Sequence, residues 1–397
     1  MLTLLEFLLG GAALVLLLPV LVLFLEVLLA TTNCGGPSTE EGERRRVAIL
    51  VPAHNEASII AGVLRSVIPQ LAGSDRLLVV ADNCSDDTAS VAIAAGAEVV
   101  RRTDLSRRGK GYALDFGVRH LERDAPDIVI IIDADCRVAA GSIDRLVRVC
   151  ARTGRPVQSL YLMHAPKGAG LKTRIAEFAW IVKNQARPEG LHRLGLPCQL
   201  MGTGMAFTWL CISTSELATG HIVEDLKLGI DLASAGTPAL FCPEALVTSI
   251  FPESSEGIQT QRTRWEHGHL ALILSDVPRL LLESLTTHNV GLMTLALDLS
   301  VPPLALLMLL MAVVWLASVL FLILAKAQFP FVIATTAAVL LALSVLLSWR
   351  RYGRNIISLG SLAYALIYAV WKIPLYLRFL VSRQRVWTRS KRDEDQP

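Results

Sequence analysis

The sequence IVIIIDAD, at residues 128–135, decides the fold of the central part of the chain. Its first five residues, 128–132, are an unbroken run of β-branched side chains, which is typical of a strand buried on both faces of a parallel sheet. Two aspartates, Asp133 and Asp135, follow this strand directly. Ligands of open α/β sheets bind beyond the carboxyl ends of the strands, so both carboxylates are expected at a binding crevice.

The residues upstream repeat a strand-then-helix pattern. Apolar, strand-like runs lie at 47–51, 77–81 and 98–101, and helix-like stretches follow them at 56–70, 87–95 and 110–122. An alternation of this kind predicts parallel strands joined by crossover helices. We therefore predict an α/β fold built on a Rossmann-like, mostly parallel sheet.

Acidic side chains follow three of these strands. Glu56 comes after the first and Asp82 after the second, while Asp133 and Asp135 follow the strongest. Carboxylates spaced i, i+2 repel one another unless a cation or a proton lies between them. Because Mg²⁺ and Mn²⁺ bind oxygen ligands, the sequence predicts a Mg²⁺ or Mn²⁺ site at Asp133 and Asp135.

Structural roles are the alternatives for two of the acids. Asp86 has the residue type that caps helices, and Glu56 is placed to complement the dipole of the helix that follows. Cys84 and Cys136 lie beside these acids and are expected to be packing residues.

The composition excludes several classes of protein. Of 397 residues, 53% are hydrophobic and only 18% are charged, which excludes an ordinary soluble enzyme. The formal net charge is +3, and no basic stripe studded with aromatic residues occurs, so no nucleic-acid partner is expected. The seven cysteines include no CxxC pair, so neither a disulfide framework nor a zinc site is predicted.

The hydrophobic residues are concentrated at the two ends of the chain. Residues 7–25 carry no charge and follow no basic segment, which favours a retained membrane anchor over a cleaved signal peptide. The runs 301–325 and 327–349 predict two spanning helices joined by a tight turn. The run 356–371 is shorter, so it could span with a tilt, lie in the interface or re-enter.

These runs divide the chain into four predicted parts. They are an anchor at 1–30, a central domain at 45–285, a C-terminal membrane region at 290–382 and a basic tail at 383–397. Basic residues follow the anchor at 44–46 and the third helix at 350–354. Because basic residues favour the cytoplasmic side, we expect a multi-pass protein of the cell (inner) membrane with a cytoplasmic central domain. A cytoplasmic tail favours a last segment that does not span.

Seven motifs, in order, give the central region a family resemblance. They are PAHNE at 52–56, DNCSDDT at 82–88, RRGKGYAL at 107–114, DAD at 133–135, GTGMAF at 202–207, VED at 223–225 and QRTRW at 261–265. The chain resembles inverting GT-A glycosyltransferases of family 2, in the branch that contains cellulose, hyaluronan and poly-N-acetylglucosamine synthases. The resemblance covers the middle domain well and the membrane ends only in general plan.

The resemblance implies a donor site for a UDP-sugar. Glu56 and Asp82 would contact the uracil and ribose, and Lys110 would meet the diphosphate. Asp133 would lie near the ribose and the metal, with Asp135 as the principal metal ligand. Arg264 and Gln261 of the Q-x-x-R-W motif would complete the donor site, Arg264 as a clamp on the diphosphate.

The resemblance also implies acceptor-side and catalytic residues. The acceptor would meet Trp265 and the loop residues Gly202, Thr203 and Gly204, although that loop could also be an ordinary turn. Asp225 would be the general base, with Glu224 as the other acid of the motif. Both open a predicted helix, where a capping role is the alternative for one of them. Val223 departs from the threonine that is usual in the family.

The expected function is metal-dependent hexosyl transfer from a UDP-sugar to an exopolysaccharide chain or a lipid-linked saccharide. The alternatives are a non-processive glycolipid-forming enzyme and a non-catalytic subunit of a polysaccharide assembly. A degenerate subunit would be expected to lose Asp135, Asp225 or Arg264, and all three are present. The C-terminal runs hold few polar residues to line a polymer channel, which favours a homo-oligomer, a partner subunit or transfer without translocation.

Overall fold

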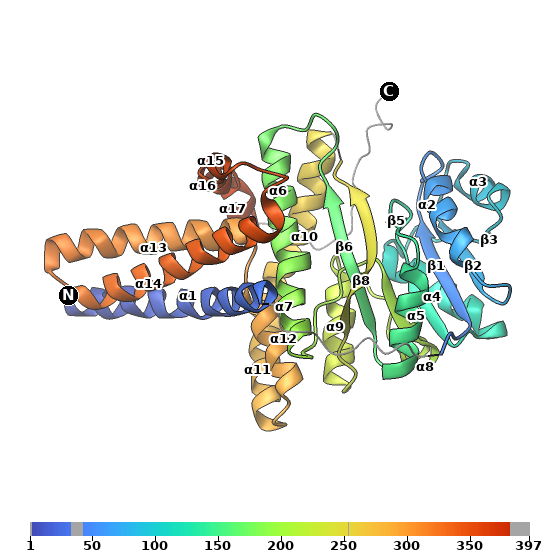
Figure 1. Ribbon diagram of the computed structural model, residues 1–397, viewed down its shortest axis with the longest axis horizontal. Helices are drawn as coiled ribbons and strands as arrows, with labels where there is room; N and C mark the ends of the chain where they lie inside the picture. The colour runs from blue at the N-terminus through green and yellow to red at the C-terminus, as the bar shows by residue number, and fades with distance from the viewer. Residues whose placement is uncertain (1, 33–42, 253, 382–397) are drawn as a thin grey trace. The chain divides into compact units, whose positions relative to one another are not determined.

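The computed structural model describes residues 2–32, 43–252 and 254–381, and it shows two compact units (Figure 1). We call residues 43–166 and 195–268 the sheet unit. The helical unit consists of residues 2–32, 167–194 and 269–381. The predicted tail at 383–397 lies outside the described residues, and the domain boundaries drawn from the sequence stay predictions.

The sheet unit is built on eight strands. They are β1 (Val47–Ala53), β2 (Arg76–Asp82), β3 (Glu98–Arg102), β4 (Ile128–Ile131), β5 (Arg137–Val138), β6 (Val157–His164), β7 (Met205–Thr208) and β8 (Leu240–Ile250). The strand order is β3-β2-β1-β4-β7-β6-β8-β5. The first four strands in that order are parallel, β7 runs antiparallel to β4 and β6, and β6 and β8 are parallel. The predicted α/β fold is confirmed.

Helices connect and cover these strands. They are α2 (Ile60–Val67), α3 (Thr88–Ala94), α4 (Lys110–Leu121), α5 (Ser142–Thr153), α8 (Trp209–Ser213), α9 (Glu224–Ser234) and α10 (Ser255–Ser275), the last of which ends in the helical unit. The helix predicted at 56–70 begins later, at Ile60, because the chain first turns at Asn55, where φ is 55°. This turn keeps Glu56 at the end of β1 rather than inside the helix.

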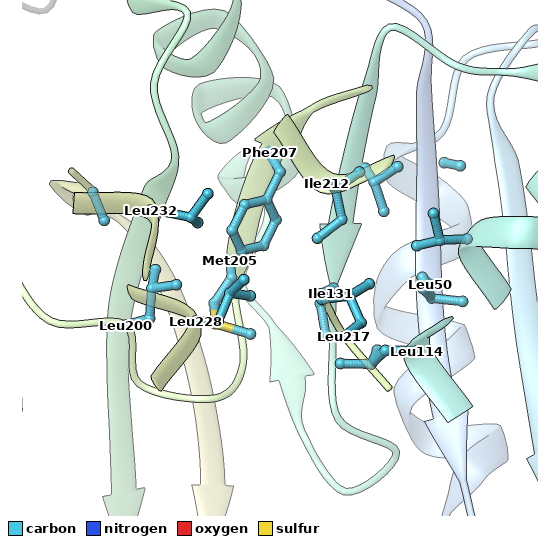
Figure 2. Close-up of a cluster of buried hydrophobic side chains, with 14 of the residues drawn as sticks. Leu50, Leu114, Ile131, Leu200, Met205, Phe207, Ile212, Leu217, Leu228 and Leu232 are labelled. Carbon is cyan, nitrogen blue, oxygen red and sulfur yellow. The ribbon is translucent and has the colours of Figure 1, made fainter. Parts of the chain in front are cut away.

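A buried apolar cluster fixes the helices that carry the site. Figure 2 shows Leu114 of α4 and Leu228 of α9 in the same cluster as Ile131, Met205 and Phe207 of the central strands. Helix α4 lies very close to the sheet, since a Cβ at Gly117 would overlap the side chain of Leu50 and lie 2.9 Å from that of Val80. The first turns of α4 and α9 are therefore held against the carboxyl end of β4 by packing.

The helical unit is built from both short helices and long apolar helices. They are α1 (Leu2–Thr31), α6 (Leu171–Ile181), the π-helical η3 (Val182–Ala186), α7 (Arg187–Arg193), α11 (Val277–Thr286), α12 (Val290–Ser300), α13 (Leu304–Ala325), α14 (Gln328–Ser348), the π-helical η4 (Trp349–Gly353), α15 (Leu359–Leu362), α16 (Tyr364–Trp371) and α17 (Ile373–Val381). Helices α1, α13 and α14 run side by side (Figure 1).

Four stretches of the described chain are long and apolar enough to cross a membrane. They are Thr3–Thr31, Leu304–Ala325, Gln328–Gly353 and Leu359–Val381. The first three coincide closely with the apolar runs seen in the sequence. The fourth contains most of the run 356–371 and is divided among three short helices.

A buried charge cluster joins three helices of the helical unit. The Nε atom of Arg187 on α7 donates to Oε2 of Glu26 on α1 at 2.8 Å, and the guanidinium also pairs with the Asp298 carboxylate on α12. All three side chains are buried. Breaking one partner of such a cluster leaves an uncompensated buried charge, so these contacts fix α1, α7 and α12 to one another. No motif in the sequence indicated this charge cluster.

Candidate active site of the sheet unit

Two carboxylates lie together at the end of the central strand β4. Ligand atoms of Asp133, Asp135 and Cys136 all lie within 4.8 Å of one another. Both aspartates are half-buried, and the thiol is buried. The sequence prediction that Asp133 and Asp135 share one crevice agrees with this geometry.

Lys110 connects these acids to the loop that follows residue 200. It begins α4 directly after Gly109, where a φ of 134° makes the sharp turn that a glycine permits. Its ammonium pairs with the Asp133 carboxylate and donates to the carbonyl oxygen of Gly202 at 2.6 Å. One lysine therefore ties together the end of β4 and the Gly202 loop.

Asp225 and Glu224 complete the acidic group from the first turn of α9. A Cβ at Gly202 would lie 3.3 Å from Oδ2 of Asp225 and 3.8 Å from Nζ of Lys110. The φ of Gly202 is +92°, so a side chain there would be strained as well as crowded. Glycine at this position keeps the space beside the Asp225 carboxylate open.

The charges in this region are unbalanced. Burial raises the pKa of Asp133, and the Asp135 carboxylate adds to that effect against the opposing charge of Lys110. Burial opposes the charge of Lys110, but Asp133, Glu224 and Asp225 together raise its pKa. Three carboxylates thus act on one ammonium group and a fourth, Asp135, lies beside Asp133, an excess of negative charge that favours a cation.

The donor atoms fit a hard divalent cation. Mg²⁺ and Mn²⁺ take carboxylate oxygens, which Asp133 and Asp135 supply. Burial raises the pKa of the Cys136 thiol well above its ordinary value, and the two carboxylates raise it further. The thiol donates to Oδ1 of Asp135 at 3.4 Å, and a hard cation prefers the carboxylate oxygens to this sulfur.

The buried side-chain amide of Gln158, which no sequence motif indicated, holds the loop that contains Gly202. Oε1 of Gln158 on β6 accepts from the Met201 amide at 2.8 Å, and its Nε2 donates to the Thr203 carbonyl at 2.9 Å. The Thr203 hydroxyl in turn accepts from the Asp133 amide at 3.0 Å. Gln158 and Thr203 are fully buried, so Thr203 has a supporting contact to the end of β4. The only signal in the sequence is a glutamine inside a mostly apolar strand.

Gln158→Leu is expected to loosen this loop. Leucine is close to glutamine in size but leaves a buried amide and a buried carbonyl without partners, at about 1–3 kcal/mol each. We expect a lower denaturation midpoint together with a lower transfer rate. Ser159→Ala is the matched control, because the buried Ser159 hydroxyl has no hydrogen-bond partner in the described part of the chain. Equal effects of the two variants would contradict the assigned role of Gln158.

Two predicted donor-site acids lie at the ends of β1 and β2. Asp82 is buried, and its Oδ1 accepts from the guanidinium of Arg102 at 2.6 Å. Glu56 is half-buried, and its amide donates to the Thr88 hydroxyl at 2.7 Å. Asp82 therefore already has a cationic partner, which sequence reasoning did not find because Arg102 belongs to the neighbouring strand β3.

Asp86 has the structural role that the sequence raised as its alternative. Its Oδ1 accepts from the Thr88 amide at 3.0 Å, and its Oδ2 accepts from the Ala57 amide at 3.1 Å. Burial raises the pKa of Asp86, but these hydrogen bonds outweigh burial and lower it overall. The carboxylate thus joins the start of α3 to the turn that carries Glu56.

The QRTRW motif lies on α10, with Gln261, Arg264 and Trp265 all half-buried. Arg264 is close enough to Glu224 for its charge to lower the pKa of that acid, and its buried Nε has no hydrogen-bond partner among the described residues. Gln261 lies one turn earlier on the same face, as expected for residues spaced i, i+3. Arg264 is the member of the motif whose charge reaches the acidic group.

Glu224 is expected to make the stability of the protein depend on pH. Burial, aided by Asp225, raises its pKa from 4.5 to about 7 against the opposing charges of Lys110 and Arg264. The folded protein therefore keeps a proton that the unfolded chain releases near pH 4.5. This stabilisation is present below about pH 4.5 and is lost as the pH rises through about 7.

Melting of metal-free protein between pH 5 and 8 measures this dependence. The Tm of Glu224→Gln should fall less steeply with pH than that of the parent. Glu216→Gln is the control, since Glu216 lines a pocket together with Glu224 but is itself exposed. An unchanged slope in Glu224→Gln would show that another group is responsible.

Comparisons with known proteins agree with this fold. Residues 44–268 match the family model described as glycosyltransferase like family 2. A probable glycosyltransferase, YdaM of Bacillus subtilis, is 25% identical over 244 residues, which cover 58% of this chain and 57% of that protein. Glucosyl-3-phosphoglycerate synthase of Mycobacterium tuberculosis is 39% identical over 97 residues, or 23% of this chain and 29% of that protein.

A solved structure shares the fold over most of the chain. Mannosyltransferase PcManGT from Pyrobaculum calidifontis superimposes with a TM-score of 0.56 and 17% identity, covering 95% of this chain and 100% of that one. The chain spans no more than 57% of the length of the two curated relatives named above. Because the family match covers more than half of the 397 residues, this protein belongs to the family-2-like glycosyltransferases, with a GT-A fold.

Proposed function

We propose that this protein is a membrane-embedded, inverting glycosyltransferase that moves a sugar from a UDP-sugar to a saccharide chain or a lipid-linked saccharide. One observation carries the proposal: the charges of Asp133, Glu224 and Asp225 act on Lys110 at the end of the central strand, where Asp135 lies beside Asp133. A cluster of this composition is suited to a divalent cation and a diphosphate, the two charged components of such a reaction.

The donor side consists of acids and cations with separate tasks. Asp135 and Asp133 would hold Mg²⁺ or Mn²⁺, which supplies a Lewis acid that stabilises charge on the departing diphosphate. Lys110 and Arg264 offer positive charge to the same oxygens, and a planar guanidinium suits a phosphate pair best. We assign Glu56 and Asp82 to the nucleoside and Gln261 to support of the diphosphate.

The acceptor side is assigned to Asp225 and its surroundings. The acceptor oxygen forms a bond to the anomeric carbon while the bond from that carbon to the diphosphate breaks, and Asp225 takes the acceptor proton. The open space beside Gly202 supports this assignment, because a side chain there would contact Oδ2 of Asp225. We assign Trp265, Thr203 and Gly204 to the acceptor side as well, Trp265 as a stacking face for a sugar ring.

Arg264→Ala tests the diphosphate clamp. Losing a charge-assisted hydrogen bond of about 1.5–3 kcal/mol should weaken UDP binding about 10- to 100-fold, as measured by calorimetry. Arg264→Lys should recover part of the lost UDP affinity, since lysine keeps the positive charge but lacks the planar guanidinium that can make two parallel hydrogen bonds. Arg262→Ala is the control, because residues two apart on a helix face different sides. UDP affinity unchanged in Arg264→Ala would refute the clamp.

The membrane assignment rests on the apolar helices. The stretches Thr3–Thr31, Leu304–Ala325 and Gln328–Gly353 support an anchor and a helical pair. The basic residues at 44–46 and 350–354 support a cytoplasmic catalytic domain. Helices α13 and α14 carry few polar side chains, which supports transfer to a lipid-linked acceptor, or export through a partner subunit or an oligomer.

A substrate panel tests the whole proposal. Purified protein is incubated with UDP-sugars and GDP-sugars, with and without EDTA, and products are weighed by mass spectrometry. GDP-sugars are included because the PcManGT structure is a complex with GDP-Man and Mn²⁺. We expect metal-dependent transfer from one UDP-sugar. No turnover from any donor, combined with intact UDP binding, would favour the non-catalytic subunit instead.

A further inference from the structure

The last apolar stretch of the described chain, Leu359–Val381, is an irregular helical segment. It consists of α15, α16 and α17, separated by the single residues Ala363 and Lys372, whose backbone angles stay in the helical region. Lys372 therefore places a charge inside the stretch. A charge near the middle of a membrane-spanning helix costs several kcal/mol unless it is paired or reaches the interface.

The buried side of this segment packs at one end of α13. Tyr376 and Phe379 of α17 pack in a cluster with Leu270 of α10 and with Leu306 and Leu309, which belong to the first two turns of α13. Helix α16 contacts α6 and α13 (Figure 1). A segment that crossed the bilayer beside α13 would be expected to follow that helix along its length.

The other side of the segment is an exposed apolar surface. Its members are large and at least half exposed, and they are Leu359, Tyr364, Leu366, Ile367, Val370, Trp371, Leu377, Leu380 and Val381. Water alone would not favour such a contiguous surface, since exposed apolar patches of this kind mark a partner or a membrane.

Cations paired with aromatic rings lie on this segment and on its neighbours. Lys172 of α6 lies 3.2 Å from the ring centre of Trp371, and Lys372 lies 5.0 Å from that of Tyr368. Arg354 is 5.7 Å from Trp349 in the same unit. Aromatic residues with adjacent lysine and arginine are typical of the boundary between headgroups and acyl chains.

The charge of these segments has one sign. Residues 349–381 contain five basic residues and no acidic one, and residues 167–174 contain three basic residues and no acidic one. A basic surface next to exposed apolar side chains is complementary to an anionic lipid headgroup with its acyl chain below.

We propose that Leu359–Val381 lies in the plane of the membrane surface and does not cross the bilayer, with Lys172 and Lys372 contacting the phosphates of anionic lipids. The exposed apolar surface enters the boundary between headgroups and acyl chains, and α17 stays packed on the first turns of α13. This inference concerns the helical unit alone and does not depend on the proposed transfer reaction.

Depth measurements with nitroxide labels test the orientation. Single cysteines replace Leu359, Val370 and Val381, in a background where Cys34, Cys84 and Cys211 are serine, and the protein is reconstituted in vesicles. We expect all three labels at a similar shallow depth, roughly 5–10 Å below the headgroups. Leu316→Cys is the control, because Leu316 is exposed in the middle of α13 and a label there should lie deep in the bilayer. A label at Val370 near the bilayer centre, as deep as the control, would overturn the proposal.

Vesicle composition tests the headgroup contact. Adding phosphatidylglycerol to phosphatidylcholine vesicles should reduce the mobility of the Val370 label, and Lys172→Gln with Lys372→Gln should abolish the change. Lys326→Gln is the matched control, since Lys326 is exposed at the turn between α13 and α14. Equal label mobility in both lipids, or an unchanged response in the double variant, would overturn the assignment to anionic headgroups.

Discussion

Asp225→Asn is expected to reduce the transfer rate by about 10²–10⁴-fold, or roughly 3–5 kcal/mol of activation free energy. Asparagine keeps the size of the side chain and its place beside Gly202 but cannot take the acceptor proton. UDP affinity should barely change, because the assigned role is toward the acceptor. Thermal stability should hold within about 1 kcal/mol, as for a near-isosteric change at a half-buried position.

The same helix offers the control for this experiment. Asp231 lies later on α9, more than half exposed and paired with Lys227, so Asp231→Asn should leave both rate and affinity unchanged. If Asp225→Asn kept more than about a tenth of the parent rate, the base would have to be another group. Glu224 would then be the candidate, since its pKa of about 7 also suits a general base.

The sheet and its acids could be predicted because both depend on local sequence. The run at 128–132 and the two aspartates after it needed no information from elsewhere in the chain. Parallel strands end at one edge of a sheet, so acids placed directly after separate strands meet there. Strand β1 pairs in parallel with both β2 and β4, so the carboxyl ends of the three strands lie at the same edge of the sheet. This arrangement is the physical basis of the prediction.

Contacts between distant segments could not be predicted in the same way. Gln158 precedes the loop that it holds by more than 40 residues, and Arg102 pairs with Asp82 from the adjacent strand. The segment 167–194 lies inside the range predicted for the catalytic domain, yet it belongs to the helical unit. Its residues Phe178, Val182 and Ala186 are buried against the long apolar helices, a preference that depends on partners far away in the sequence.

Removing the metal is expected to abolish transfer and to weaken UDP binding. EDTA leaves Asp133 and Asp135 as like-charged neighbours without the cation between them, although Asp133 keeps its ion pair with Lys110, and Mn²⁺ or Mg²⁺ should restore both properties. A Lewis acid supplies several kcal/mol to the departure of the diphosphate, so the loss should be at least about 100-fold. Full turnover in metal-free buffer would contradict the assignment of both aspartates.

Asp135→Asn separates the metal from a general effect of removing charge. A neutral amide is a weak ligand for a hard cation, so this variant should need much more Mn²⁺ for half-maximal activity and should bind UDP poorly. Asp86→Asn is the matched change, because Asp86 only joins α3 to the Glu56 turn. Asp86→Asn should lower Tm slightly and leave the Mn²⁺ concentration needed for half-maximal activity unchanged. If both variants shifted that requirement equally, bulk charge rather than coordination by Asp135 would set the metal dependence.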